Sequence, residues 1–423
     1  MAKIIPFKAL RYDKKVSLKQ VVCPPYDVIN RIQRREYMQK SPYNIVKIVL
    51  PNRKGPVSDY KKAKRDLSRW IDRGILKYDD TPSFYIYVQE CLVKGKKISR
   101  CGFLSLLRLE DSEAGGVLPH ENVFSKPLFD RVNLMKAAKA HLSPIFIVFQ
   151  DKNARAHGIL EHIVKAKKPD LDIYADSARH KIWRLTDNIL IEKLIRHLNL
   201  SQTFIADGHH RFRASIKARD YFDNKKSKTN GHRYTLAYLV SSEDAGLRIL
   251  PTHRAVKVLP GAFSLNYLES KLKGYFDISF ISANKAEKML KRAFKNKQCA
   301  FVLYYKKRYI FIVLKDKKII KDIGPKCASL KWKSLDISIL HNLIFKKLFR
   351  MKERVAKDRN IYYYKDKREL IGQVDLGRQG LGVLLNPSTM EDVIALAKNN
   401  EKMPHKSTYF YPKPLTGLVI HKF

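Results

Sequence analysis

The sequence predicts an α+β protein with more than one domain. Its 423 residues exceed what one hydrophobic core usually serves, so two or three subdomains are expected. The hydrophobic content of 45% is that of an ordinary globular protein. Strand-like and helix-like runs follow each other irregularly through the middle third, which favours an α+β arrangement over regular βαβ winding.

The first recognisable elements are a helix and a hairpin. Residues 57–76 place apolar side chains on one helical face, with Ser58 in the N-cap position and Gly74 as the stop. The runs 84–93 and 98–109 are β-rich and are separated by the turn-like KGKK, which predicts a hairpin.

The middle of the chain continues the mixture of elements. Residues 143–150 are typical of a buried strand and 187–199 of a helix. A further strand, 202–206, runs directly into Asp207, and 234–242 is again strand-like.

We expect three regions along the chain. Residues 1–254 hold the N-terminal and central part, 255–375 form an inserted α+β subdomain, and 376–423 add a strand, a helix and a terminal segment. In the last region Ser388 and Glu391 have the spacing of a capping box. The segment that follows is rich in aromatics and prolines, so we expect it to pack back on the protein.

The charge balance is strongly basic. Lys and Arg number 84 and Asp and Glu 40, a formal net charge of +44, which makes nucleic acid a partner to consider. The basic runs are dispersed, however, and none belongs to a recognisable nucleic-acid-binding motif. Solvated surface is therefore favoured over a dedicated nucleic-acid groove.

Targeting and cysteine signals favour the cytoplasm. No run of about 18 apolar residues occurs, so no membrane span is expected, and the N-terminal apolar segment is short for a secretory signal. Five cysteines are scattered without a C-x-x-C pair, which argues against a disulfide framework or a zinc knuckle. We expect buried, reduced thiols at Cys23, Cys91, Cys101, Cys299 and Cys327.

The densest group of ionisable residues is the stretch FIADGHHRFRAS, residues 204–215. Asp207 is placed to cap a helix that starts near His209, and Gly208 would let a ligand approach the backbone. The amides of residues 208–211, with Arg211 beside them, would then bind an anion, most naturally a phosphate.

Two other readings of this stretch stay open. An aspartate cap followed by polar first-turn residues occurs at many helix starts without any ligand. A metal site is the third reading, but adjacent helical residues such as His209 and His210 point about 100° apart and cannot share one ion.

Four further clusters carry candidate chemistry. In the loop LPHENVF, Glu121 could act as a general base or bind Mg²⁺, beside His120. Asp27 could cap the helix after the rigid Pro-Pro-Tyr26. Possible contacts to a substrate or anion are Tyr26, Asp27, Arg131, Thr252, His253 and Arg254, and a phosphate-type donor set is Lys406, Ser407 and Thr408. Each cluster also has a purely structural reading, such as a polar strand end or a packed tail.

These segments together resemble the domain of unknown function 1015 family. The resemblance runs in order through FKALRYD, CPPYDVI, SPYNIV, PHE, ADGHHR, LPTHR and MPHKSTYFYPK, and spans almost the whole chain. That family has no settled activity.

The order Pro-His-Glu, Asp-Gly-His-His-Arg and a C-terminal Lys-Ser-Thr also resembles free serine kinases of the ParB/sulfiredoxin superfamily. The resemblance implies a ParB/sulfiredoxin-like mixed core, with Glu121 as the base and the turn 207–211 as the phosphate site. Lys406, Ser407 and Thr408 would close that site. A large insertion between Glu121 and Asp207 is implied, and His405 interrupts the third motif.

The favoured hypothesis is a small-molecule kinase that transfers phosphate from ADP or ATP, with Mg²⁺, to a hydroxyl such as that of free L-serine. Catalysis is expected from Glu121, His120 and Asp207, and Mg²⁺ would lie near Glu121 or Asp207. The first alternative is a ParB-like regulator that binds a nucleotide, for example CTP, without catalysis. The second is a nucleic-acid-binding protein that owes its affinity to the charge of +44.

Overall fold

The protein was analysed as a computed structural model that describes residues 2–54, 57–110, 116–259, 261, 263–351 and 360–423. The chain forms two compact units, which are described separately. Unit 1 comprises Met1–Arg248 and Phe410–Phe423, and unit 2 comprises Ile249–Tyr409. Both combine helices with sheets, so the expected mixture of helices and strands is confirmed.

Unit 1 is built on a large mixed sheet. Its strands follow the spatial order β11-β12-β6-β7-β14-β10-β13-β8, and β1 also pairs with β7. The β10–β14 and β13–β8 pairs are parallel, and the other pairs are antiparallel. The strands are β1 (Ile4–Ile5), β6 (Phe84–Val93), β7 (Lys96–Arg108), β8 (Val117–Leu118), β10 (Ile145–Phe149), β11 (Leu171–Ala175), β12 (Ala178–Leu185), β13 (Thr203–Asp207) and β14 (Tyr234–Ser241).

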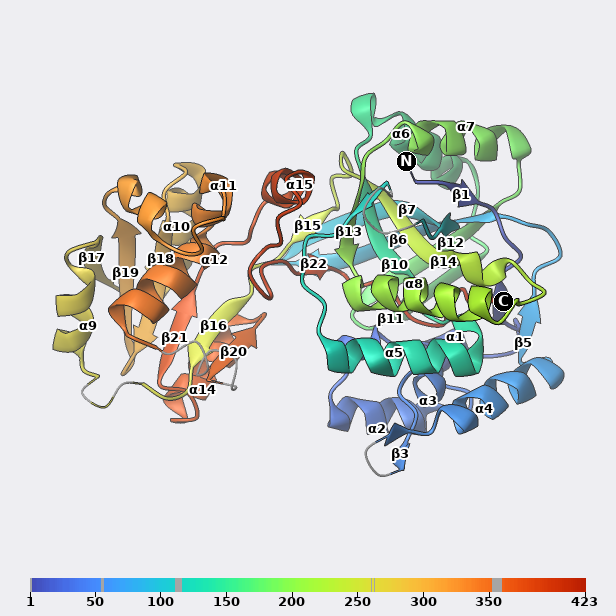
Figure 1. Cartoon of the computed structure of the whole chain (residues 1–423), viewed down its shortest axis with the longest axis horizontal. Coiled ribbons are helices and arrows are strands. Elements are labelled where there is room, and N and C mark those ends of the chain that lie inside the picture. The colour runs from blue at the N-terminus through green and yellow to red at the C-terminus, as the bar shows by residue number, and fades with distance from the viewer. Residues whose placement is uncertain (1, 55–56, 111–115, 260, 262, 352–359) are drawn as a thin grey trace. The chain divides into compact units, whose positions relative to one another are not determined.

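Helices lie on both faces of this sheet (Figure 1). Helices α6 (Arg155–Ala166) and α7 (Asn188–Asn199) pack on one face, where Leu160 and Leu194 join strand residues such as Phe103 in a buried cluster. On the other side α5 (Ser125–Ala138) and α8 (His209–Asn224) lie side by side (Figure 1). Because both faces are covered, the central strands are apolar nearly throughout.

A second layer of short helices packs beneath α5. Helix α4 (Tyr60–Asp72) contributes Leu67 and Trp70 to a cluster that also buries Ile48 and Ile420. The other elements of unit 1 are β2 (Leu10–Tyr12), α1 (Leu18–Val21), η1 (Tyr26–Val28), α2 (Arg31–Lys40), α3 (Val46–Val49), β3 (Arg53–Lys54), β4 (Val57–Ser58), β5 (Leu76–Tyr78), β9 (Ala140–His141), η2 (Lys152–Ala154), η3 (Gly231–Arg233), β22 (Phe410–Tyr411), β23 (His421–Lys422) and, at the boundary, β15 (Arg248–Ile249).

Unit 2 has a six-stranded antiparallel sheet in the order β17-β19-β18-β21-β16-β20. Its strands are β16 (His253–Val256), β17 (Phe276–Ile281), β18 (Ala300–Tyr305), β19 (Arg308–Leu314), β20 (Ile361–Tyr364) and β21 (Leu381–Leu384). Its helices are α9 (Leu265–Leu272), α10 (Ala283–Lys295), η4 (Lys317–Asp322), α11 (Leu330–Lys333), α12 (Asp336–Ile339), the π-helix η5 (Leu340–Leu348), α14 (Lys367–Asp375) and α15 (Met390–Lys398).

The units do not follow the expected regions 1–254, 255–375 and 376–423. Strand β16 begins at His253 and pairs with β20 and β21, so it belongs to unit 2. Strand β21 and helix α15 also belong to unit 2, and only residues 410–423 return to unit 1. The boundaries between the two units therefore follow from strand pairing, and the local composition of the sequence does not reveal which strands pair.

Three expected helix caps lie elsewhere. Asp59, not Ser58, caps α4 by accepting the Lys62 amide proton at 2.9 Å. Helix α2 begins after Asn30, which forms a capping box with Gln33, so Asp27 is not its cap. The capping box of α15 is formed by Thr389 and Asp392, not by Ser388 and Glu391. In each case another polar residue close by in the sequence caps the helix in place of the expected one.

Two composition-based expectations can be compared with the fold. In the part of the chain that the structure describes, no helix combines the length and apolarity needed to cross a bilayer. All five cysteines are free, and four of them are buried. Cys327 is exposed, so the expectation that every thiol is buried was wrong for this residue.

The C-terminal segment of unit 1, residues 410–423, is held by a buried arginine. Arg100 on β7 is fully buried, and its guanidinium donates to the carbonyl oxygens of Tyr411 (3.3 Å) and Pro412 and to the Gln89 side chain. The guanidinium also lies 4.5 Å from the Phe146 ring centroid. This one side chain therefore joins the sheet to the start of the C-terminal segment, at β22 and Pro412.

We expect Arg100→Lys to lower the free energy of unfolding by about 2–3 kcal/mol, because an ammonium cannot reproduce the fork of donors in a buried site. Urea denaturation of the full chain measures the change. Arg179→Lys is the control, since Arg179 forms an exposed pair with Asp172 and should change stability little. Equal effects of the two substitutions would contradict this role of Arg100.

A buried histidine pair closes the end of the same segment. Strand β23 pairs with β9 so that His421 lies opposite His141, and the two rings stack with centroids 5.8 Å apart. Burial, with the nearby His421 second, lowers the pKa of His141 to about 3. Burial also lowers the pKa of His421 to about 4, although its bond to the Gly231 carbonyl opposes this.

Unit 1 should therefore lose stability in acid. The unfolded chain binds protons at these histidines below about pH 6.5, whereas the folded chain resists protonation until about pH 4, so stability is full above the unfolded pKa and falls between these values. Thermal unfolding between pH 7 and pH 4.5 should show a shallower decline for His141→Phe than for the wild type. His162→Phe, at an exposed helical position, should keep the wild-type slope.

Candidate functional site

The turn between β13 and α8 has a different construction from the expected aspartate cap. Gly208 is the N-cap of α8 with φ of 94°, and Asp207 is the last residue of β13. The Asp207 carboxylate accepts a hydrogen bond from Arg211 Nη2 at 2.8 Å and another from Lys413 Nζ. The carboxylate is bonded to two cations and does not cap the helix, which corrects the capping interpretation.

Gly208 makes room for Arg211. A Cβ atom at position 208 would lie 3.0 Å from the guanidinium carbon of Arg211, and the positive φ disfavours other residues. Arg211 is itself buried and also donates to the Pro144 carbonyl oxygen. Burial lowers the pKa of Arg211, while the nearby Asp27 acts in the opposite direction. We expected a ligand to lie close to the backbone at Gly208, but the side chain of Arg211 occupies that space.

The two adjacent histidines hold a distant loop. His209 Nε2 accepts the backbone N–H of His120 at 3.2 Å, and His210 Nε2 accepts that of Phe124 at 3.0 Å. The residues of the first pair are 89 positions apart in the sequence. Because neighbouring helical side chains diverge, each histidine holds one end of the loop 120–124. The side chains of His209 and His210 diverge too far to share a metal ion, and this same divergence lets them hold two points of the loop.

This arrangement brings Glu121 to the start of α8. The Glu121 carboxylate lies 3.7 Å from His209 Nδ1. Since Nε2 of the His209 ring accepts a hydrogen bond, the neutral ring carries its proton on Nδ1, the nitrogen that faces Glu121. The ring of His120, fully buried, lies edge-on to His209 with centroids 4.6 Å apart. Glu121, His120 and the turn after β13 thus form one cluster.

Lys413 is a member of this cluster that the sequence did not identify. It lies in the C-terminal segment, 8% of its side chain is exposed, and its ammonium pairs with Asp207. Burial lowers the pKa of Lys413, whereas Asp27 and Glu121 act to raise it, so both carboxylates are near the ammonium. The only sequence signal was its place between two prolines after an aromatic run, a pattern that says nothing of a carboxylate partner.

Three further predicted residues lie in the same part of unit 1. The Arg131 guanidinium is 4.1 Å from the centroid of the Tyr26 ring and donates to the Val49 carbonyl at 2.9 Å. Burial raises the pKa of Tyr26, and Arg131 opposes this rise most strongly. Asp27 acts on Arg211 and Lys413 through its charge. Tyr26, Asp27 and Arg131 therefore border the Asp207 cluster.

The other predicted contacts belong to unit 2. Arg254 is fully buried there, and its guanidinium donates to the carbonyl oxygens of Thr252 and Lys406, the latter at 2.7 Å. His253 Nδ1 accepts the Leu385 amide proton at 3.3 Å. Ser407 is buried and donates to the Pro404 carbonyl oxygen. Thr408 follows in the same segment, so this group supports the fold of unit 2.

No ready-made metal site occurs among the described residues. The residues that the structure describes include no group of three or more His, Cys, Asp and Glu side chains that could hold a metal ion. Asp207 does not fit as a Mg²⁺ ligand in this arrangement because both carboxylate oxygens are bonded to cations. Of the two carboxylates near which Mg²⁺ was expected, Glu121 and Asp207, only Glu121 remains as a candidate ligand.

Comparisons with solved structures give distant similarities. A free serine kinase mutant in complex with AMP is 14% identical with a TM-score of 0.34, over 72% of this chain and 89% of that chain. A conserved hypothetical protein from Pyrococcus furiosus is 16% identical with a TM-score of 0.32, over 72% and 92% of the two chains. SbnI from Staphylococcus aureus, truncated at its C-terminus, is 9% identical with a TM-score of 0.35, over 75% and 86%. TM-scores this low do not establish a common fold.

Sequence comparison is more decisive. No curated protein matches the chain. A family model described as "Protein of unknown function (DUF1015)" matches residues 4–338, which is most of the sequence and includes both Glu121 and the Asp207 turn. The chain belongs to the DUF1015 family.

Proposed function

We propose that the Asp207 cluster binds a nucleotide and transfers a phosphoryl group to a hydroxyl of a small metabolite, with free L-serine as the first acceptor to test. The observation that carries the proposal is the 3.7 Å separation between the Glu121 carboxylate and His209 Nδ1. It puts a carboxylate beside the positive end of a 16-residue helix, where phosphate groups are favoured.

Glu121 has the attributes of a general base. A base must lie within hydrogen-bond reach of the hydroxyl it deprotonates and must be held in one orientation. His209 Nδ1, 3.7 Å from the carboxylate, would orient it if the two groups close to hydrogen-bond distance when substrate binds, and the His120 amide holds the ring through its other nitrogen. Glu121 would take the hydroxyl proton as the oxygen–phosphorus bond forms, and the nucleotide would leave with the electron pair of the broken P–O bond.

Charge neutralisation would come from the cations on Asp207. Lys413 and Arg211 are both bonded to that carboxylate, and the amides at the start of α8 point outward from the helix end. An accompanying Mg²⁺ would be held chiefly by phosphate oxygens, because Asp207 is already bonded, and would supply further neutralisation. The resemblance of Pro-His-Glu and Asp-Gly-His-His-Arg to the free serine kinase motifs supports the same roles.

A regulator that binds a nucleotide without catalysis is the second candidate. The bond between Lys413 and Asp207 favours it, because a phosphate that draws Lys413 away would loosen the segment 410–423 from the end of β13. A melting-temperature screen with ADP, ATP and CTP, with and without Mg²⁺, identifies the nucleotide. A ligand at a hundred times its Kd should stabilise the protein by about 2.7 kcal/mol.

The kinase proposal is tested by product formation. Incubation with Mg²⁺, L-serine and either ADP or ATP should yield O-phosphoserine, observed by ³¹P NMR. Glu121→Gln should abolish turnover while nucleotide affinity changes little, because the substitution removes the base and keeps the size of the side chain. Glu192→Gln, at an exposed position on α7, is the control and should remain active. Nucleotide binding without product from any hydroxyl acceptor would favour the regulator.

The two candidate lysines can be separated directly. Lys413→Met should weaken ADP or ATP binding at least about tenfold, since a buried ammonium at a phosphate site is lost. Lys406→Met is the matched control and should change the affinity little, and isothermal titration calorimetry measures both. A loss confined to Lys406→Met would overturn the assignment of Lys413 and restore the motif-based one.

A further inference from the structure

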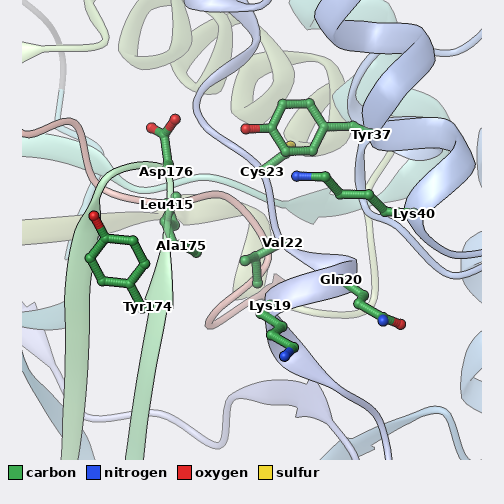
Figure 2. A pocket seen from close by; sticks show the side chains of 10 residues that line it. All are labelled: Lys19, Gln20, Val22, Cys23, Tyr37, Lys40, Tyr174, Ala175, Asp176 and Leu415. Carbon is green, nitrogen blue, oxygen red and sulfur yellow. The ribbon is translucent and has the colours of Figure 1, made fainter.

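Unit 1 has a second cavity that involves none of the residues assigned to phosphoryl transfer. It has a volume of about 380 Å³ and lies among α1, α2 and the turn between β11 and β12 (Figure 2). This volume is in the range of small-molecule sites. Its floor is apolar, formed by the buried side chains of Val22, Cys23 and Leu415.

Groups of opposite charge face the cavity from two sides. In Figure 2 the Asp176 carboxylate and the Tyr37 hydroxyl point toward each other above the floor, and the Lys40 ammonium lies on the Tyr37 side. After burial, the charge of Asp176 is the next largest cause that raises the pKa of both Tyr37 and Cys23, so the carboxylate is near both groups. The Lys40 ammonium lies 4.4 Å from the Tyr37 ring centroid.

The cations at this cavity lack acidic partners. Over the described ranges of the chain, neither Lys19 nor Lys40 has a carboxylate oxygen within 4.0 Å. Each ammonium is therefore available to an anionic group of a ligand. The Tyr174 ring forms the opposite wall and is 69% exposed, so it is accessible to a ligand.

The turn that presents Asp176 has a left-handed backbone. Asp176 and Ser177 have φ values of 47° and 63°, as both central residues of a two-residue hairpin turn of type I′ require. Aspartate is one of the residues that adopt this conformation readily, so the hairpin fixes the backbone from which the carboxylate projects.

We propose that this cavity binds an α-amino acid with an aromatic or branched aliphatic side chain. The ligand carboxylate would pair with Lys40, its ammonium with Asp176, and its side chain would cover Val22, Cys23 and Leu415 beside the Tyr174 ring. The opposite charges across the cavity select a zwitterion, and the apolar floor selects an apolar side chain. The proposal is independent of the phosphoryl-transfer proposal.

The same short segment of the chain, residues 413–415, contacts both the cavity and the Asp207 cluster. Leu415 lines the cavity, and Lys413, two residues earlier, is bonded to Asp207. An amino acid that contacts Leu415 would therefore act on the segment that carries Lys413. This places the second site where its occupancy can influence nucleotide binding.

The test is titration of the full chain with L-phenylalanine, followed by calorimetry. We expect saturable binding that Lys40→Met and Asp176→Asn each weaken at least about tenfold, and asparagine keeps the left-handed turn. Lys61→Met, an exposed position on α4, is the matched control and should bind as the wild type does. Phenethylamine lacks the carboxylate and N-acetyl-L-phenylalanine lacks the ammonium, so both should bind more weakly.

Three results would overturn the proposal. One is the absence of binding by L-phenylalanine and L-leucine at millimolar concentration. A second is binding that Lys40→Met and Asp176→Asn leave unchanged. The third is AMP binding that depends on Lys40, which would reject an amino acid as the ligand class. Glu121→Gln should retain L-phenylalanine affinity and Asp176→Asn should retain ADP or ATP affinity, so failure of one site is distinguishable from failure of the other.

Discussion

The Asp207 carboxylate is the interaction on which the site depends. One side chain joins the end of β13, the first turn of α8 through Arg211, and the C-terminal segment through Lys413. The Asp207 side chain is only 14% exposed, and a carboxylate so far removed from water is unfavourable unless its charge is compensated, as the two cations do here. Both oxygens of the carboxylate bind these cations, and the N-cap of α8 is Gly208 and not Asp207.

Around this bridge, neutral hydrogen bonds place the charged groups. The imidazole nitrogens of His209 and His210 accept two main-chain N–H groups from the loop 120–124, and this loop carries Glu121. On the other side, Arg100 holds the carbonyls that precede Lys413. The catalytic candidates are therefore positioned by contacts between segments that are remote in sequence, and no single helix or strand contains them.

The sequence identified local features better than their partners. The strand ending at Asp207, the helix after it and the pairing of 84–93 with 96–108 follow from periodicity and turn chemistry, and the structure contains all of them. The charged cluster was found because four polar residues and a glycine are adjacent in the sequence. Lys413 was missed because the pairing of a lysine with Asp207 depends on the path of 14 residues between Phe410 and Phe423, and no local pattern encodes that path. Likewise, the unit boundary at 248 follows from the pairing of β16 with β20, a contact across more than a hundred residues.

The discontinuity of unit 1 has a consequence for its assembly during translation. Its first segment ends at Arg248 and its second begins at Phe410, so a ribosome makes all of unit 2 before it makes the last strand of unit 1. Domains that are continuous in sequence can complete their folding as they emerge. Here the nascent chain carries Asp207, Arg211 and Glu121 without Lys413, and the Asp207 cluster remains incomplete until synthesis has passed residue 413. A chain released early would thus contain most of the sheet but no assembled site.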